Sequence, residues 1–279
     1  MAQNSKIEWC HHTANLWWGC TKVHEGCDHC YAETLSNRWN FDVWGNDKPR
    51  RTINSVWKDL AKYQKLAKEA NEIHRVFVGS MMDIFEKPML LVNSKGEIIE
   101  GMDTNELRQV LFHSIGRGDY KNLMFLFLTK RPSNINKYIP ESWKENPPSN
   151  VMFGTSPVNQ ATFHKLVNQL CEVKGKRFLS IEPQLEEISL YKEDCVFGKV
   201  YSSTAKGNGI GGQTITSDKP NIDWIIQGGE SGAHKRPFNL EWAYTLRDEC
   251  LAIGIPYFFK QVDKVQPIPE DLMIRQFAN

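Results

Sequence analysis

Three cysteines close together near the start of the chain are the residues best suited to chemistry. Cys20, Cys27 and Cys30 follow a C-x6-C-x2-C pattern within the stretch WWGCTKVHEGCDHCYAE. Thiolates that converge on one point bind zinc or an iron–sulfur cluster, and a loop that leads into a helix can hold them there. The residues from Tyr31 to Arg38 have the pattern of such a helix. The spacing therefore predicts a metal ion or a cluster at this loop.

The remaining cysteines do not suggest a disulfide framework. The chain has seven cysteines, an odd number, and three of them fall within eleven positions. In a reducing compartment such a cluster is more often metal-binding or catalytic. Cys171 and Cys250 lie in helical patterns, where a lone cysteine is usually a small buried side chain. We therefore expect one functional cysteine cluster.

The composition is that of a globular protein with a sizeable core. The chain has 279 residues, of which 41% are hydrophobic and 24% are charged, and its net charge is +1. This charge excludes a broad electrostatic attraction to nucleic acid, although a local basic patch remains compatible with it. There is no apolar run of about 18 residues, and the N-terminus MAQNSKIEW lacks a signal-peptide core. The expected location is the cytoplasm, without contact to a membrane.

Short apolar segments alternate with amphipathic ones along most of the chain. Strands are predicted at 76–80, 123–128, 151–154, 178–183, 222–227 and 255–259. Helices are predicted at 52–72, 103–115, 160–172 and 239–252. Apolar strands separated by helices indicate a parallel sheet made of βαβ units. With one more strand before the cysteine loop, we expect a single α/β domain, a partial or complete (β/α) TIM-like barrel with about six or seven parallel strands.

Two segments interrupt this alternation. Residues 88–102 contain a turn signal between short apolar pieces and are expected to form a hairpin-like insertion. Residues 191–220 are rich in Gly, Ser, Thr and Lys, and they lack the strand and helix context of a dinucleotide fingerprint. We expect a flexible insertion or a lid over the site there.

Polar residues follow nearly every predicted strand. They are Gly79, Ser80, Asp83, Thr129, Lys130, Arg131, Thr155, Ser156, Asn159, Glu182, Gln227, Gly228, Gly229, Glu230, Ser231, Lys260 and Gln261. In a β/α barrel the catalytic residues gather at the C-terminal ends of the strands. A carboxylate directly after a buried strand, as at Glu182, costs several kcal/mol unless it is paired or liganded. The pattern therefore predicts one shared site at this end of the barrel.

The cysteine loop and the strand ends together resemble the radical S-adenosylmethionine enzymes. The commonest motif of those enzymes is C-x3-C-x2-C, so the first spacing of this chain is longer. Four segments resemble more closely a bacterial and phage-borne family of radical-SAM-like proteins. They are WWGCTKVHEGCDHCYAE, VFVGSMMDIFE, FLSIEP, and WIIQGGESG followed by RPF and YFFKQ. The resemblance extends from about residue 7 to 262 and leaves out 191–220.

The resemblance implies a cofactor and a type of reaction. Cys20, Cys27 and Cys30 would each bind one iron of a [4Fe-4S] cluster, and the fourth iron would bind S-adenosylmethionine. An electron from a flavodoxin-type or ferredoxin-type partner would then yield a 5′-deoxyadenosyl radical, which abstracts hydrogen from the substrate. The cationic residues and the phage-borne relatives lead us to expect a nucleotide or a DNA base as the substrate. Whether such an enzyme isomerises, cleaves, dehydrogenates or methylates it is not readable from the motif.

The resemblance also assigns roles to individual residues. Gly79, Ser80 and Asp83 occupy the place of the family motif that holds the methionine amino group. Ser156 and Glu182 suit the ribose hydroxyls or the carboxylate of the cofactor. The other expected cofactor contacts are His29, Gly228 and Gly229. Lys130 and Glu230 are the candidate catalytic residues, and the candidate substrate contacts are Arg131, Gln227, Lys235, Arg236 and Lys260.

Two other kinds of protein remain compatible with these residues. A structural zinc site could use the three cysteines with His24 or His29 as the fourth ligand. It leaves the polar strand ends without a role. A metal-dependent hydrolase could use Asp83, Glu182 and Glu230, which leaves the cysteine loop without a role.

Overall fold

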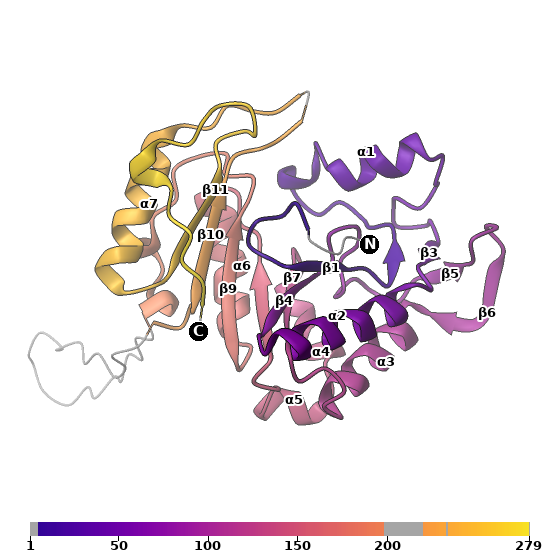
Figure 1. Ribbon diagram of the computed structural model, residues 1–279. Helices are drawn as coiled ribbons and strands as arrows, with labels where there is room; N and C mark the ends of the chain where they lie inside the picture. Colours follow the sequence, from indigo (N-terminus) through magenta and orange to yellow (C-terminus); the bar gives the residue numbers. More distant parts are fainter. Residues whose placement is uncertain (1–4, 198–219, 233, 279) are drawn as a thin grey trace, which may run out of the picture.

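Seven strands form one all-parallel sheet that curls into a half-barrel (Figure 1). The computed structural model describes residues 5–197, 220–232 and 234–278. Across the sheet the strands are β1 (His12–Ala14), β4 (His74–Val78), β7 (Leu123–Thr129), β8 (Val151–Thr155), β9 (Lys176–Ile181), β10 (Trp224–Gly228) and β11 (Tyr257–Gln261). Their order across the sheet is their order in the chain. This confirms the predicted single α/β domain with a partial TIM-like barrel.

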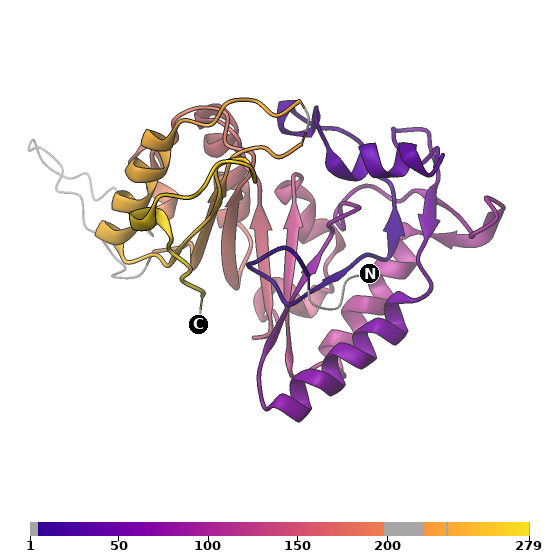
Figure 2. The same ribbon diagram turned by 45° about the horizontal axis from the view of Figure 1, so that its top comes forward.

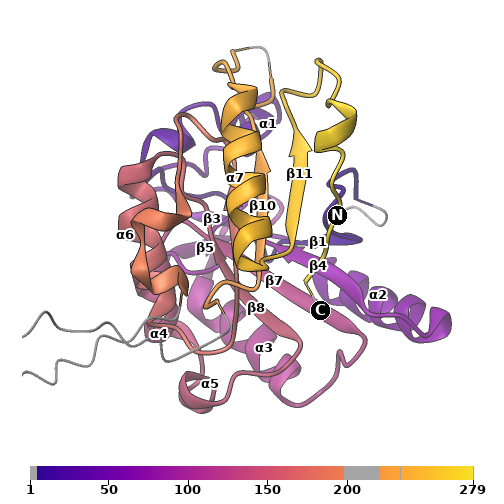
Figure 3. The ribbon, with the colours of Figure 1, turned by 90° about the vertical axis from the view of Figure 1, so that its left-hand side faces the viewer.

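Helices cover the outer face of the half-barrel. The long ones are α2 (Val56–Ala70), α3 (Thr104–Gly116), α6 (Gln160–Cys171) and α7 (Leu240–Ile253), and the short ones are α4 (Ile135–Tyr138) and α5 (Glu141–Glu145). Figure 3 shows α6 and α7 on the outside of the sheet. Phe112 of α3 meets Phe127 of β7 edge to face, with ring centroids 5.4 Å apart. Since both faces of the central strands are buried, the strands are apolar throughout, as predicted.

Aromatic side chains fill the inner face of the half-barrel. Trp9, from the segment before β1, packs on Phe77 with ring centroids 4.7 Å apart and meets Trp224 edge to face at 6.3 Å. Phe178 and Phe258 belong to the same cluster. Trp9 and Phe77 also form part of the floor of a cavity above them. The interior is therefore a packed core, and the space for a ligand lies at the C-terminal ends of the strands.

A second, smaller sheet carries the cysteine loop. Its strands are β2 (Trp17–Trp18), β3 (Arg50–Thr52), β5 (Leu90–Val92) and β6 (Ile98–Asp103). β5 and β6 pair antiparallel, which confirms the hairpin predicted at 88–102. The cysteine loop follows β2 and leads into α1 (Tyr31–Arg38). The strand predicted before the loop is β1, and two residues and the short strand β2 lie between β1 and the loop.

The cysteine loop nevertheless lies at the C-terminal end of the half-barrel. Figure 2 shows α1 on the side toward which the arrowheads of the central strands point. A parallel bridge between Gly19 and Met82 joins the start of the loop to the segment after β4.

The glycine-rich segment predicted as an insertion or lid at 191–220 lies mostly outside the described residues. Its described start contains two short 3-10 helices, η3 (Leu190–Lys192) and η4 (Asp194–Phe197). In the part of the chain that the structure describes, no helix has the length and apolar character needed to cross a lipid bilayer.

Candidate functional site

A cavity of about 390 Å³ lies between the cysteine loop and the ends of the barrel strands. This volume falls in the range of roughly 300–1,000 Å³ that is typical of small-molecule and cofactor sites. Most of the predicted site residues line it. They are Cys20, Cys27, His29, Cys30, Gly79, Ser80, Asp83, Lys130, Arg131, Ser156, Glu182, Gly229, Glu230 and Lys260. The structure therefore brings these strand-end residues and the cysteines to one cavity.

The local backbone fixes how the cysteines are presented. Gly19, directly before Cys20, has φ +114°, and a Cβ atom there would lie 2.3 Å from the carbonyl oxygen of Val43. Only glycine fits this position. Further along, His24 caps the 3-10 helix η1 (Glu25–Cys27) by accepting a 3.1 Å hydrogen bond at Nδ1 from the amide of Gly26. The loop is thus shaped by specific contacts at both of its turns.

The three thiols line the same cavity. Among the described residues, no three His, Cys, Asp or Glu side chains already form a metal-binding group. Burial, and to a lesser extent the carboxylates of Asp83 and Glu86, raise the pKa of Cys20 to about 12, and Arg131 opposes them. Burial also raises the pKa of Cys30. Both thiols are therefore protonated at neutral pH in the free protein, and a bound metal would replace these protons.

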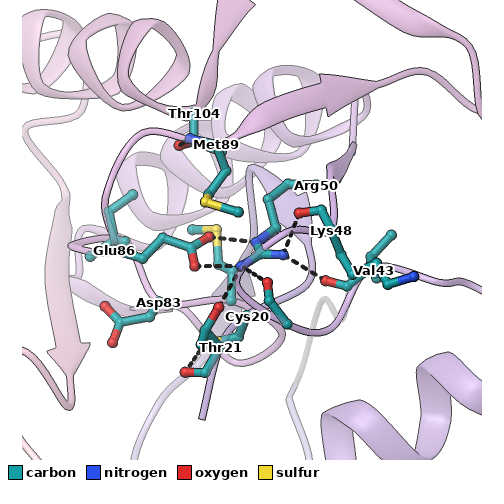
Figure 4. Close-up of polar contacts among 12 residues, drawn as sticks. Cys20, Thr21, Val43, Lys48, Arg50, Asp83, Glu86, Met89 and Thr104 are labelled. Carbon is teal, nitrogen blue, oxygen red and sulfur yellow. Dashed lines mark hydrogen bonds and ion pairs between the residues drawn. The ribbon is translucent and has the colours of Figure 1, made fainter. Parts of the chain in front are cut away.

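A buried ion pair anchors the cysteine loop from below (Figure 4). Arg50 of β3 binds both carboxylate oxygens of Glu86, at 2.8 and 2.9 Å. The same guanidinium donates to Thr21 Oγ1 at 3.0 Å and to the carbonyl oxygens of Val43 and Lys48, both at 2.9 Å. The side chains of Arg50 and Glu86 are 0% and 2% exposed. Because Thr21 follows Cys20, this network fixes the first cysteine relative to the barrel.

A second arginine lies directly beside Cys20. Arg131 donates to Asp83 Oδ2 at 2.7 Å and to the Thr21 carbonyl oxygen at 2.5 Å, and its Nη1 lies 3.9 Å from Cys20 Sγ. Asp83 also accepts hydrogen bonds from Thr129 Oγ1 at 2.7 Å and from the backbone amide of Lys130 at 3.2 Å. Asp83 therefore holds Arg131 in place, and Arg131 presents its positive charge to the first cysteine.

Glu230 connects the end of β10 to the cysteine loop. It accepts hydrogen bonds from Arg236 at 2.6 and 3.0 Å and lies 2.9 Å from His29 Nδ1. Arg236 in turn donates to the carbonyl oxygen of Glu25 at 3.2 Å. These contacts, which we call the Glu230 clasp, tie residues more than 200 positions apart. The clasp closes one side of the cavity.

Glu182 has an oxygen atom that nothing in the described structure satisfies. Its Oε2 accepts from Lys260 at 3.0 Å and from Ser180 Oγ at 3.3 Å. Its Oε1 is buried and has no hydrogen-bond partner among the described residues. A Cβ atom on Gly228 would lie 3.0 Å from this oxygen, so the glycine leaves it room. An unpaired buried acceptor at the wall of a cavity is a candidate ligand contact, because leaving it unsatisfied costs about 1–3 kcal/mol.

The five cationic residues expected at the site, Lys130, Arg131, Lys235, Arg236 and Lys260, were expected to form a cationic rim for an anionic substrate. Most of them are neutralised by ion pairs, which corrects that expectation. Arg131 pairs with Asp83, Arg236 with Glu230 and Lys260 with Glu182. Lys235 pairs with Asp263 at 3.0 Å and does not line the cavity. Among the described residues, Lys130 is the member of this set whose side chain forms no ion pair. Of the five predicted cations, only Lys130 is therefore unpaired among the described residues.

Gln227 was wrongly expected at the site. Its side chain donates to the Trp242 carbonyl oxygen at 3.1 Å and also contacts Gln184 and Tyr257, so it faces α7. Successive side chains of a strand point to opposite faces, and Gln227 lies on the outer one. Neither Gln227 nor its neighbour Gly228 lines the cavity, whereas Gly229 does.

Several residues of the site were missed from the sequence. Arg50 and Glu86 form the buried ion pair, and Ser180 and Trp44 line or support the cavity wall. Glu86 could have been noticed in the sequence, because it is a charged residue within the mainly apolar stretch DIFEKPML. Its partner could not be inferred, because the two residues are far apart in the chain.

Glu230 is expected to make the protein sensitive to acid. Burial alone would raise the pKa of Glu230, but hydrogen bonds from Arg236 and His29 outweigh it and lower the pKa from 4.5 to about 2. A carboxylate with a lowered pKa stabilises the folded state above the unfolded pKa of 4.5, and this stabilisation is lost as the pH falls toward 2. We expect Glu230→Gln to reduce the free energy of unfolding at neutral pH by about 2 kcal/mol.

The measurement is urea unfolding of both proteins at several pH values. As the pH falls, the free energy of unfolding should decrease less in Glu230→Gln than in the wild type, because the variant lacks the carboxylate that becomes protonated in the wild type. Glu141→Gln is the control, since Glu141 is 86% exposed in its pair with Lys144. Identical pH dependence in the wild type and Glu230→Gln would contradict this role.

Comparison with known proteins gives one family. The family model described as "Protein of unknown function (DUF5131)" matches residues 4–271, which include every site residue discussed above. Comparisons with curated proteins and with solved structures gave no match. The chain therefore belongs to the DUF5131 family.

Proposed function

We propose that this protein is a radical S-adenosylmethionine enzyme that acts on a nucleotide or a nucleic-acid base. The observation that carries the proposal is the position of Cys20, Cys27 and Cys30, which line one cavity at the C-terminal end of a parallel half-barrel. That end of a β/α barrel is where such folds bind cofactors and carry out catalysis.

The residues present suit a [4Fe-4S] cluster. The three cysteines would each bind one iron, and thiolates are the ligands that such clusters take. Arg131, 3.9 Å from Cys20 Sγ, would donate toward the thiolate and offset its negative charge. Reduced by a flavodoxin-type or ferredoxin-type partner, a cluster held by these cysteines would supply the electron for cleaving S-adenosylmethionine into methionine and a 5′-deoxyadenosyl radical, which would take hydrogen from the substrate.

The walls of the cavity offer contacts for S-adenosylmethionine. Glu182 Oε1 is a buried acceptor without a partner among the described residues, which suits a ribose hydroxyl or the amino group. Ser80 and Ser156 add hydroxyl groups to the lining. Lys130 offers an ammonium group for a carboxylate or a phosphate. These polar groups are few and convergent, as is usual for a site that orients one ligand.

The Glu230 clasp would protect the reaction from solvent. It holds His29 and the Glu25 carbonyl against the loop after β10, across the cavity. A carbon radical must be kept away from water and from stray hydrogen donors until it meets the substrate. With Arg236 bound to it, Glu230 is better suited to closing the site than to exchanging protons.

A second candidate, a structural zinc site, is favoured by one observation. The Nε2 atom of His24 is buried and has no hydrogen-bond partner among the described residues, so it is available as a fourth ligand. His29 is less available, because its Nδ1 binds Glu230. The hydrolase alternative loses support, since Asp83 and Glu230 are both ion-paired with arginines.

The experiment that tests the proposed function is anaerobic incubation with S-adenosylmethionine. The protein is first reconstituted with iron and sulfide and then reduced with dithionite. We expect 5′-deoxyadenosine to accumulate, even without substrate, at a rate that rises when the true substrate is added. Absence of 5′-deoxyadenosine from a protein with a full complement of iron and sulfide would contradict the proposal.

A further inference from the structure

Beside the cavity, aromatic rings and arginines form an exposed surface that the proposed chemistry does not use. Trp18, Trp39, Phe41 and Arg51 contact one another there, and the exposed Arg38 directly precedes Trp39 in the chain. We call these five residues the Trp39 patch. Trp18 and Trp39 have ring centroids 5.1 Å apart, and Phe41 lies 5.8 Å from each of them. The guanidinium of Arg51 sits over the Phe41 ring, 4.2 Å from its centroid.

The patch exposes ring surface that a folded protein normally buries. Trp39 directly follows the last residue of α1, and two other aromatic rings lie beside it. Its side chain is nevertheless 53% exposed. The rings contact one another, and Trp18 belongs to β2, so the fold sets the positions of the rings. Large exposed aromatic side chains that are already fixed in place are typical of binding surfaces, because little side-chain entropy is lost on binding.

Two chain connections link the patch to the cavity. Trp18 is two residues before Cys20, and the segment that begins at Trp39 and Phe41 continues to Trp44, which lines the cavity. At its other end, α1 begins at Tyr31, which lines the cavity too. Eight helical residues span about 12 Å. A ligand only a few nucleotides long would therefore reach from the patch into the site.

The chemistry of the patch selects for flat, anionic ligands. Ring faces stack on nucleobases whatever the base, and each stacked base contributes about 1–3 kcal/mol to binding. Arg38 is exposed and, among the described residues, has no hydrogen-bond or ion-pair partner, so its charge is free for a phosphate. The bases of a duplex are already stacked on one another, and only unpaired bases can use these rings. A net charge of +1 gives the protein little overall attraction to the phosphate backbone of a nucleic acid, so base stacking suits it better as the main source of affinity.

We propose that the Trp39 patch binds the unpaired bases of a single-stranded nucleic acid, with the neighbouring nucleotide directed into the cavity. The delivery of a nucleotide into the cavity rests on the proposed function, because it makes the strand the substrate. The binding of a strand to the Trp39 patch does not rest on the proposed function, because binding requires no turnover.

The test is the affinity of the reconstituted full-length protein for a fluorescein-labelled oligonucleotide, measured by fluorescence anisotropy. The probes are a 12-residue strand of thymidylate, the same length of uridylate, and a thymidylate strand with abasic sites in its centre. We expect Trp39→Ala to weaken binding of at least one intact strand by about tenfold, as loss of one stacked base implies. Trp39→Phe should recover most of the affinity. The abasic strand should bind the wild type and Trp39→Ala equally weakly.

The matched control is Tyr191→Ala, which removes another exposed aromatic residue. Tyr191 is 55% exposed and stacks on Phe197 with centroids 5.6 Å apart, away from the cavity. Its removal should leave the affinity unchanged. The proposal is overturned if neither intact strand binds, if Trp39→Ala binds as tightly as the wild type, or if a duplex of the same sequence binds better than the single strand. Each of these results leaves the 5′-deoxyadenosine assay unaffected, so the two proposals fail separately.

Discussion

Replacing Cys27 by alanine is expected to abolish both the iron–sulfur cluster and the formation of 5′-deoxyadenosine. Cys27 lines the cavity together with Cys20 and Cys30, and in the proposed function each of the three binds one iron. Mutation of a residue that hydrogen-bonds to a metal ligand typically lowers metal affinity or activity by about 10–100-fold. Loss of a ligand itself should lower them at least as much. The measurements are iron and sulfide content, the broad visible absorption of the brown protein, and 5′-deoxyadenosine by chromatography.

Cys171→Ala is the control for this substitution. Cys171 is also a partly buried free cysteine, but it lies on α6 and does not line the cavity. It should keep the wild-type iron content, colour and activity. If Cys27→Ala were as brown and as active as Cys171→Ala, the cysteine loop would not hold the cluster.

Replacing Arg50 by methionine is expected to destabilise the whole protein by about 3–5 kcal/mol, the usual cost of breaking a buried ion pair. The substitution leaves the Glu86 carboxylate, 2% exposed, without its bidentate partner. It also removes the donor that holds Thr21, next to Cys20. For a chain of this size, we expect a fall in Tm of roughly 10 °C and a lower iron content after reconstitution.

Two further variants separate the buried pair from general effects of charge. Lys48→Met breaks an ion pair with Asp42 whose side chains are 37% and 77% exposed, and it should cost less than about 1 kcal/mol. Arg50→Met combined with Glu86→Leu should be more stable than Arg50→Met alone, because no unpaired charge stays buried. If the double variant instead had a lower free energy of unfolding than Arg50→Met alone, as expected when two substitutions act independently, this explanation would be contradicted.

The fold was largely readable from the sequence, because it depends on local patterns. Leu123–Thr129 is a continuous apolar run, and it forms the central strand β7. The helix predicted at 103–115 is α3, and the structure shows that it begins with a capping box formed by Asp103 and Glu106. The cysteines were found for the same reason, since their spacing is a local property. What the local pattern missed was the short β2, whose two residues pair with β3 in a separate sheet.

The contacts within the site were not readable, because they join residues that are distant in the chain. Lys260 was predicted to face a substrate, yet it pairs with Glu182, 78 positions away. The Glu230 clasp joins positions 201 apart. Gln227 was misplaced for another reason, since an uninterrupted apolar strand gives no alternation from which to choose a face. The sequence shows which charged residues lie near the site, but only the fold shows which of them neutralise each other.

The most direct test of the central claim is the electron paramagnetic resonance spectrum of the reduced, reconstituted protein with and without S-adenosylmethionine. We expect about four irons and four sulfides per chain and a signal typical of a reduced [4Fe-4S] cluster. We also expect that signal to change when S-adenosylmethionine binds the open iron. A colourless protein with one tightly bound zinc would contradict it. So would a cluster whose signal stays the same at saturating S-adenosylmethionine.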